Sequence, residues 1–563
     1  IYGVRYNNPF TISSTTTLKF YTKDITNHKS DVVIVNYIFA HIGNLNTGKG
    51  FNSIQSAIND VDTVSGNVIK VKPGVYNENI VISKSIALVG DVNGSVILKG
   101  VNSNNPVIGI TKNANNTLIY GLKITDSNFG IVVLESNNVT LLSNSFNNVV
   151  ESIICQNDSN TQIANNTIGF SNVVNGVTGI HIRSSKNLFV LNNTISLKSN
   201  SGSSCGIVSV FNDGCNMSIV NNKITNIYNG GFGITLQGFN IRIYKNNISN
   251  LRNGLAIDCS NSNISFNNLF DNEYGLYIHI SRNNSYVSNN IYNNTKYGAY
   301  LDSSSISLND KFYLNRLVNN GYFDFYSASS YVINISDNWW GEHYPKVSRN
   351  NYILANIFNG TGGVVLDSWI KISLYSASYE VLDGFLQRAK IYIDMNYNNL
   401  NKMVSNDEYL PDMWGGMSCF NNDGFAFEGL TKIVNGVGFV YFNLTSLFES
   451  FDNINVFGFM DNDNVSMILN KNVSININIF SSALDLSTFN FMNYVLDIPM
   501  VDNTSWITVA WRQISLYCGF IDVIVNGCVV NSINISNAGY QAFKNQDFSP
   551  NFFEAMKMFN IFF

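Results

Sequence analysis

The sequence predicts an all-β protein, in which a parallel β-helix solenoid is followed by one or two β-sandwich domains. Three observations predict this fold class. Two short sequence markers recur with a common period of about 22 residues, apolar residues alternate within each repeat, and the period disappears after about residue 364. A fixed period of this length is typical of solenoids.

The first marker is an asparagine followed two residues later by an apolar residue. It recurs in steps of 22 to 29 residues, with its asparagines at Asn144, Asn166, Asn193, Asn222, Asn246, Asn268 and Asn290. In a β-helix the equivalent positions of neighbouring coils lie about 4.8 Å apart, so each side-chain amide can bond the next. At roughly 0.5–1.5 kcal/mol net per bond, such a column fixes the register but does not hold the fold alone.

The second marker is a glycine followed by an apolar residue. Its glycines are Gly130, Gly179, Gly206, Gly233, Gly254, Gly275 and Gly298. After Gly the first and third residues are apolar, as in Gly254-Leu-Ala-Ile-Asp258, which is the two-residue period of a strand with one buried face. A leucine-rich repeat has a similar length and an Asn, but it needs Leu at fixed offsets that are absent here.

The chain divides into four predicted segments. Residues 1–50 are an N-terminal extension, 51–345 the β-helix, 364–480 a β-sandwich and 481–563 a second β-rich domain. The segment 51–61 has Ile54, Ala57, Ile58 and Val61 at helical spacing, which predicts a short amphipathic helix across the open end of the solenoid.

The residues of the first predicted coil resemble a known pattern. Ile69-x-Val-x-Pro-Gly-x-Tyr-x-Glu-x-Ile-x-Ile82, followed by Ile86-x-Leu-x-Gly90, resembles the opening of the pectin lyase-like right-handed parallel β-helices. That likeness implies the fold, while the superfamily's functions range from lyases, hydrolases, esterases and epimerases to inert surface proteins.

The end of the solenoid resembles a narrower group. Asn338-Trp-Trp-Gly341, followed by alternating runs with turn signals such as Asn422-Asp-Gly424, resembles adhesin-like surface proteins of methanogenic archaea, which carry Ig-like modules. The resemblance implies an Ig-like sandwich after the solenoid. The paired tryptophans either cap the core or offer a sugar-stacking platform.

Composition limits the partners. Among 563 residues only 13% are charged and the formal net charge is −5. No basic patch is evident, which argues against a nucleic-acid ligand. No run of 18 apolar residues suggests a membrane span, and a chain that opens at Ile1 fits a processed extracellular protein. Cofactors and metals are not expected.

Two kinds of covalent modification are predicted. Candidate glycosylation sites in Asn-x-Ser/Thr sequons are Asn93, Asn138, Asn165, Asn192, Asn247, Asn263, Asn334, Asn443 and Asn534, although Asn-rich turns explain the same pattern. Among seven cysteines, Cys205 with Cys215 and Cys518 with Cys528 are candidate disulfides. Cys155 falls at an inward position and is expected in the core.

Candidate functional residues follow from the register. The fourth position after each Gly faces outward, so Asp258, His279 and Asp302 are expected to stack in one column. They are the candidate catalytic residues, because carboxylates beside an imidazole can carry acid/base chemistry on a sugar. The candidate glycan-binding residues are His181, Arg183, Gln237, Tyr277 and Tyr300. The superfamily's catalytic sets cannot be matched here residue by residue, which favours binding over turnover.

The sequence therefore predicts an extracellular, structural or adhesive surface protein that contacts cell-wall or host glycans. Self-assembly through the chain ends, into a homo-oligomeric layer or filament, is part of this prediction. The alternative is a polysaccharide lyase, hydrolase or epimerase.

Overall fold

A computed structural model describes most of the chain. It covers residues 16–470 except 38–39, 92–94, 211–215, 304–308, 349–355, 361, 383–384, 405–407, 421–425 and 444–452, together with 5, 7, 9–10 and 12. Beyond 470 it describes the backbone of 476–479, 496–497, 506–513, 518–525 and 528–536. Two compact units emerge, one formed by residues 1–340 and 345–369 and the other by 341–344 and 370–563.

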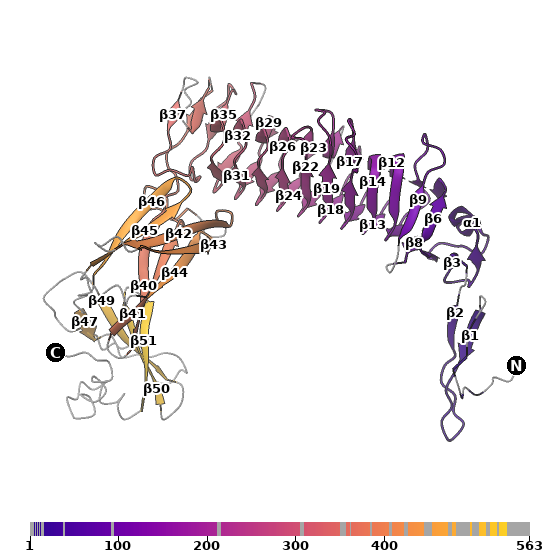
Figure 1. The fold of residues 1–563 in the computed structure, drawn as a ribbon, viewed down its shortest axis with the longest axis horizontal. Coiled ribbons are helices and arrows are strands. Elements are labelled where there is room, and N and C mark those ends of the chain that lie inside the picture. Colours follow the sequence, from indigo (N-terminus) through magenta and orange to yellow (C-terminus); the bar gives the residue numbers. More distant parts are fainter. Residues whose placement is uncertain are drawn as a thin grey trace. The chain divides into compact units, whose positions relative to one another are not determined.

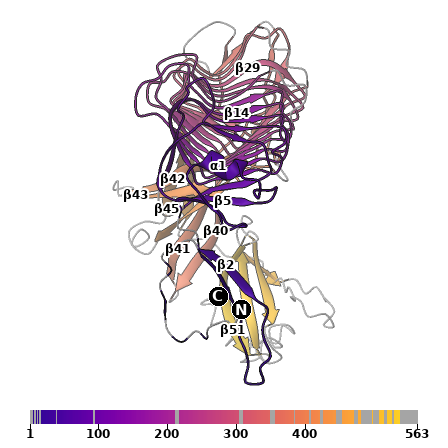
Figure 2. The same cartoon turned by 90° about the vertical axis from the view of Figure 1, so that its right-hand side faces the viewer.

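The first unit contains the predicted parallel β-helix (Figure 1). Each central coil has three strands. One belongs to a 13-stranded sheet, and the other two belong to a 22-stranded sheet that bends around two sides of the coil. Figure 2 looks along the stacked coils, with α1 at the near end.

The 13-stranded sheet consists of β3(Ile42–Asn44), β4(Gly50–Phe51), β5(Val68–Val71), β8(Ala87–Gly90), β11(Leu118–Tyr120), β13(Thr140–Leu142), β15(Gln162–Ala164), β18(Phe189–Leu191), β21(Ser218–Val220), β24(Arg242–Tyr244), β27(Asn263–Ser265), β30(Ser285–Val287) and β33(Lys311–Tyr313). In this sheet β3 is antiparallel to both β4 and β5, and the strands are parallel from β5 onward.

In the 22-stranded sheet, the row that follows the asparagine marker is short. It contains β16(Thr167–Gly169), β19(Thr194–Leu197), β22(Lys223–Asn226), β25(Asn247–Ser249), β28(Asn268–Phe270), β31(Asn290–Tyr292) and β34(Arg316–Val318).

The row that contains the glycine marker carries the candidate site. It contains β17(Thr178–Arg183), β20(Cys205–Val210), β23(Phe232–Phe239), β26(Asn253–Ser260), β29(Tyr274–Arg282), β32(Tyr297–Leu301), β35(Phe323–Ser327) and β38(Ile357–Asn359). Two long strands, β12(Lys123–Leu134) and β14(Ser145–Gln156), belong to both rows.

The remaining strands of this sheet are β6(Gly74–Asn77), β7(Ile80–Ile82), β9(Val96–Lys99), β10(Ile108–Ile110) and β37(Val347–Ser348). Two further two-stranded sheets pair β1(Thr16–Phe20) with β2(Val33–Tyr37) and β36(Ile333–Asn334) with β39(Val364–Val365).

The glycine column is confirmed, and a close backbone approach explains it. A Cβ atom added at Gly233 would lie 2.4 Å from the carbonyl oxygen of Gly254, and one at Gly254 would lie 2.6 Å from that of Gly275. Both distances are shorter than any van der Waals contact. Only glycine allows successive coils to stack at this edge.

The asparagine column is also confirmed, with a one-residue correction. The buried ladder runs through Asn246, Asn267 and Asn289, in which each side-chain oxygen accepts hydrogen bonds from the backbone N–H and the Nδ2 of the preceding Asn. The prediction of Asn268 and Asn290 was wrong, because those coils contain the doublets Asn267-Asn268 and Asn289-Asn290. The complete ladder is Asn144, Asn166, Asn193, Asn222, Asn246, Asn267, Asn289, Asn315 and Asn338.

The capping helix is α1(Ile54–Asn59). Ser53 is its N-cap and forms a capping box with Ser56, while Ile54, Ala57 and Ile58 are fully buried in the solenoid core. Val61 was wrongly expected on this face. The helix ends at Asn59, and Val61 is 85% exposed.

At the other end, Trp339 and Trp340 are 0% and 1% exposed, and Trp340 belongs to the core cluster. Neither ring offers a face to a sugar. Three short strands of the first unit follow this pair in the sequence: β37, β38, which pairs with β35, and β39.

The second unit contains antiparallel sheets in a β-sandwich arrangement. One sheet consists of β40(Ser373–Leu382), β41(Phe385–Asp394) and β44(Val437–Asn443), and another of β42(Met413–Phe420), β43(Ala426–Ile433), β45(Asn453–Met460) and β46(Asp463–Asn470). A mixed five-stranded sheet follows, with β47(Asn476–Ile479), β48(Leu496–Asp497), β49(Trp506–Gln513), β50(Cys518–Val525) and β51(Cys528–Ser536).

Candidate functional site

Three columns of side chains face outward on the row of glycine-marked strands. We name them by their offset from the marker glycine. In the central coils, the first column holds the residue before Gly, the second the residue two after Gly, and the third the residue four after Gly. The strand register places these residues over one another on successive coils.

Aromatic rings dominate the first two columns towards the C-terminal end. In the second column Tyr277 stacks on Tyr300 at 5.3 Å between ring centroids, Tyr300 on Tyr326 at 5.1 Å and Tyr326 on Phe358 at 4.4 Å. In the first column Tyr274 stacks on Tyr297 at 5.4 Å. Such pairs contribute about 0.5–1.5 kcal/mol each beyond their burial. We call this set of rings the aromatic ladder.

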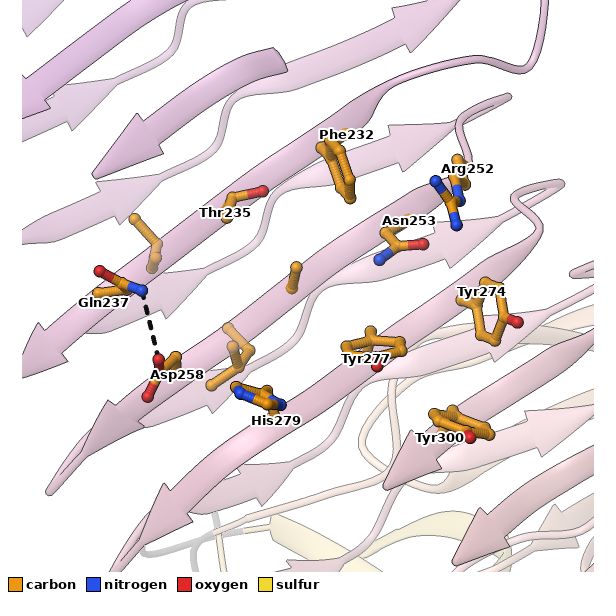
Figure 3. Close-up of a pocket in the computed structure, with 13 residues that line it drawn as sticks. Phe232, Thr235, Gln237, Arg252, Asn253, Asp258, Tyr274, Tyr277, His279 and Tyr300 are labelled. Atoms are coloured by element: carbon orange, nitrogen blue, oxygen red, sulfur yellow. Dashed lines mark hydrogen bonds between the residues drawn. The ribbon is translucent and has the colours of Figure 1, made fainter. Parts of the chain in front are cut away.

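The aromatic ladder ends at β26. There the first and second columns hold Asn253 and Ala256 in place of aromatic rings, while Phe232 occupies the first column of the preceding strand. The result is a pocket of about 440 Å³ that has β26 as its floor and β23 and β29 as its walls. We call this pocket the β26 trough (Figure 3). Its lining residues are Phe232, Thr235, Leu236, Gln237, Arg252, Asn253, Ala256, Ile257, Asp258, Tyr274, Tyr277, His279 and Tyr300.

The three candidate catalytic residues do gather here, but not as one regular column. The register shifts between Ile257 and Asp258, so Asp258 pairs with Ile280 and His279 is the extra residue of a β-bulge. Because a bulge re-aims side chains, two separate pairs form. Gln237 donates from Nε2 to Asp258 Oδ2 over 3.3 Å, and His279 Nδ1 lies 2.5 Å from Asp302 Oδ2. The prediction of an unbroken stack was wrong, although the prediction of proximity holds.

Tyr277 links this acidic cluster to the aromatic ladder. Its hydroxyl donates to Asp302 Oδ2 over 3.1 Å. Burial, together with the nearby Asp302 carboxylate, raises the pKa of Tyr277 to about 12. Burial also raises the pKa of Asp258, and His279 partly opposes this shift. The trough therefore combines a carboxyl group that holds its proton more tightly than usual with a carboxylate, an imidazole and a phenol.

The predicted glycan-binding residues divide into two groups. Gln237, Tyr277 and Tyr300 line the trough, whereas His181 and Arg183 lie on the earlier strand β17. There His181 Nδ1 is 2.8 Å from Glu151 Oε2, and Arg183 Nε donates to His181 Nε2 over 3.0 Å. The hydrogen bond from His181 is the main reason that the pKa of Glu151 is lowered. This group is a self-contained ion cluster and does not border the trough.

Several residues of the site were not predicted. The candidates came from positions after each glycine, whereas Phe232, Tyr274 and Tyr297 form the first column at the position before it. An aromatic residue directly before the marker glycine, in Phe232-Gly233, Tyr274-Gly275 and Tyr297-Gly298, was the available signal. Asn253 and Arg252 carried no such signal.

Six of the predicted glycosylation sites lie in well-described strands or turns, and all six side chains are exposed. They are Asn138, Asn165, Asn192, Asn247, Asn263 and Asn334. Asn93 lies outside the described residues, as do the side chains of Asn443 and Asn534. Asn138, Asn165 and Asn192 have positive φ values of 57°, 55° and 55°, which the turn explanation also accounts for.

The structure contradicts one of the two predicted disulfides and does not describe both cysteines of the other. Cys518 pairs with Ser536 and Cys528 with Val525, at opposite ends of the β50–β51 hairpin. Seven residues of strand separate these positions, roughly 23 Å at about 3.3 Å per residue, which is far beyond the reach of a disulfide. That pairing was wrong. Cys205 is a buried free thiol, and Cys215 lies outside the described residues. Cys155 is fully buried in the core, as predicted.

Within the described part of the chain, no three His, Cys, Asp or Glu side chains are grouped as metal ligands would be. No described helix has the length and apolar character needed to span a bilayer.

Comparison with known proteins gives one related sequence. The chain is 33% identical over 293 residues to a protein named cell surface glycoprotein from Methanothermus fervidus, a match that covers 44% of this chain and 48% of that protein. The chain thus spans about half the length of this curated relative. No family model matches the chain.

Solved structures resemble the chain only loosely. A family 28 exopolygalacturonase of Yersinia enterocolitica is 11% identical, with 63% of this chain and 81% of that chain covered and a TM-score of 0.34. The tailspike protein of the E. coli bacteriophage HK620, in complex with a pentasaccharide, is 11% identical, with 76% and 92% covered and a TM-score of 0.36. Both scores are below 0.5, and nothing about this chain's activity follows from them.

Proposed function

We propose that this chain is an extracellular cell-surface protein whose solenoid binds glycans in the β26 trough. One observation carries the proposal. The trough combines ring walls, including Tyr277, with hydrogen-bonding groups such as Gln237 and Asp258 at one end. Sugars are recognised by this combination, since their apolar faces pack on aromatic rings while their hydroxyls need polar partners.

The name of the Methanothermus relative supports a surface location, at 33% identity over about half of that protein. Cell-wall or host glycans are then the expected partners. In this account residues 364–480 form an Ig-like module, residues 481–563 form a further β-rich domain, and the chain assembles into a layer or filament through its ends. The exposed sequons would carry glycans. Light scattering and electron microscopy test the assembly, and intact mass before and after deglycosylation tests the modification.

Glycan binding is tested on an array of cell-wall and host polysaccharides with the full chain. Replacing both Tyr277 and Tyr300 by Ala should weaken binding by at least about tenfold, or about 1.4 kcal/mol. Tyr292→Ala is the matched control, because it removes a stacked, half-buried tyrosine from strand β31, in a different row of the sheet. Equal binding by the double variant and the control would refute the proposal.

The acidic cluster supports a second candidate function, a polysaccharide lyase, hydrolase or epimerase. Asp258, His279 and Tyr277 line the trough, and Asp302 lies next to it, bonded to His279 Nδ1 and the Tyr277 hydroxyl. Acid/base catalysis on a sugar uses such groups. Turnover of polysaccharides that Asp258→Asn and His279→Ala abolish, with binding retained, would establish this activity. Binding without turnover in the native chain would leave the first proposal standing.

A further inference from the structure

At the β26 trough a ring is missing between Phe232 and Tyr274 in the first column, and the second column ends at Tyr277. The walls of the trough belong to β23 and β29, which flank β26 in the same sheet. Two strand spacings of about 4.8 Å separate the walls by about 9.6 Å. A ring centred between them would lie about 4.8 Å from each wall, close to the 4.4–5.3 Å between the stacked rings of the second column.

One wall of the gap is the face of an aromatic ring. Tyr277 is stacked on Tyr300 with an interplanar angle of 22°, so its other face is directed towards Ala256, the residue beside it in the register. Figure 3 shows Tyr277 and Tyr300 nearly edge-on, one below the other. Thr235 and Phe232 form the opposite wall. A ring that enters edge-first would therefore stack on Tyr277.

The floor of the gap contains an unsatisfied polar group. The Asn253 side chain is 6% exposed, and its Oδ1 atom accepts no hydrogen bond from any described residue. Buried polar atoms are nearly always paired, so an orphan of this kind needs an explanation. A ligand hydroxyl at the floor would supply the missing partner if the Asn253 amide rotated about its Cβ–Cγ bond to present this oxygen.

Charge at the far end of the trough selects the ligand. Asp258 and Asp302 both lie at the end where His279 closes the trough, and Asp302 already receives the Tyr277 hydroxyl. Carboxylates accept hydrogen bonds from hydroxyl groups and repel other carboxylates. A ligand that places a hydroxyl edge at this end is favoured over one that places an acidic group there.

We propose that the β26 trough binds one neutral hexopyranose unit of a glycan, inserted edge-first above Ala256 and stacked on Tyr277. This inference rests on the proposed glycan-binding function and names its ligand class. The sugar's apolar face contacts the Tyr277 ring, and its hydroxyls reach Asn253 at the floor and Asp258 at the end.

The test is a substitution that fills the gap. Ala256→Tyr would extend the second column by one ring on top of Tyr277, which occupies the ligand's place and adds a stacking partner. Its melting temperature should not fall, while affinity for neutral hexose oligosaccharides, measured by titration calorimetry, should drop by about 100-fold or more, as for a filled hot-spot pocket. Val208→Tyr is the control, because Val208 stands in the same column two strands earlier and outside the trough. It should change the affinity less than about twofold.

The outcomes separate the two proposals. If Ala256→Tyr binds neutral hexose oligosaccharides as tightly as the native chain, no sugar is inserted above Ala256, although glycan binding on the solenoid would stand. Tighter binding of hexuronate than of neutral oligosaccharides of equal length would overturn the ligand class. Absence of binding to every glycan tried would overturn the proposed function itself. If Ala256→Tyr fails to fold, Thr235→Tyr narrows the gap from the opposite wall and should weaken binding in the same way.

Discussion

Replacing Asn267 by Ala should destabilise the solenoid far more than replacing its neighbour Asn268. Asn267 is fully buried, and its Oδ1 accepts from the backbone N–H of Asn246 at 3.0 Å and from Asn246 Nδ2 at 2.9 Å. Its Nδ2 donates to the carbonyl oxygens of Ile243 at 2.9 Å and Ser265 at 3.1 Å, and to Asn289 Oδ1 at 3.0 Å. Deleting the side chain therefore removes five hydrogen bonds.

The magnitude follows from that count. A hydrogen bond contributes roughly 0.5–1.5 kcal/mol net, so the five bonds predict a loss of about 2.5–7.5 kcal/mol. Asn268 is half-buried, and its Oδ1 accepts a hydrogen bond from Asn290 Nδ2 at 2.9 Å. Asn268→Ala should cost less than about 1 kcal/mol.

The assay is urea denaturation followed by circular dichroism, together with hydrogen exchange at the Asn246 amide. Asn267→Ala should lower the urea midpoint and accelerate exchange at that amide, whereas Asn268→Ala should leave both nearly unchanged. Equal losses for the two variants, or a greater loss for Asn268→Ala, would refute the buried ladder as the source of register.

Three further predictions concern other parts of the solenoid. Ile257→Ala should cost about 2–5 kcal/mol because it empties a core position, while Thr235→Ala on the outer face should stay within about 0.5 kcal/mol, both by urea denaturation. The pKa of Glu151 is lowered in the folded state, so its ionised form stabilises the fold at pH values above the ordinary Glu pKa. This stabilisation is lost as the pH falls through the lowered pKa. The difference in free energy of unfolding between the native chain and Glu151→Gln should therefore disappear in acid. The pKa of Tyr277, about 12, predicts that Tyr277→Phe removes a phenolate absorbance step from the most alkaline part of a spectrophotometric titration.

The repeat architecture could be predicted because it depends on local, periodic signals. Gly233, Gly254 and Gly275 recur where no side chain fits between coils, and the buried asparagines recur where backbone groups need partners. The one-residue error in the asparagine column arose from Asn-Asn doublets, such as Asn267-Asn268. In these doublets only burial distinguishes the fully buried ladder residue from its half-buried neighbour.

The candidate site was predicted only in part, because it depends on where the pattern fails. The β-bulge at His279 could not be predicted, because Tyr277-Ile-His-Ile280 has the alternating pattern of a regular strand. The trough likewise exists because Asn253 stands between Phe232 and Tyr274, and because the small Ala256 stands beside Tyr277. A gap of this kind is visible only when all three outward columns are aligned in space.

The most direct measurement is a crystal structure of the chain with a bound neutral hexose oligosaccharide. We predict electron density for one pyranose ring between Thr235 and Tyr277, above Ala256, with a hydroxyl in hydrogen-bonding distance of Asp258. Density for the sugar elsewhere on the protein, with the space above Ala256 empty, would contradict the account.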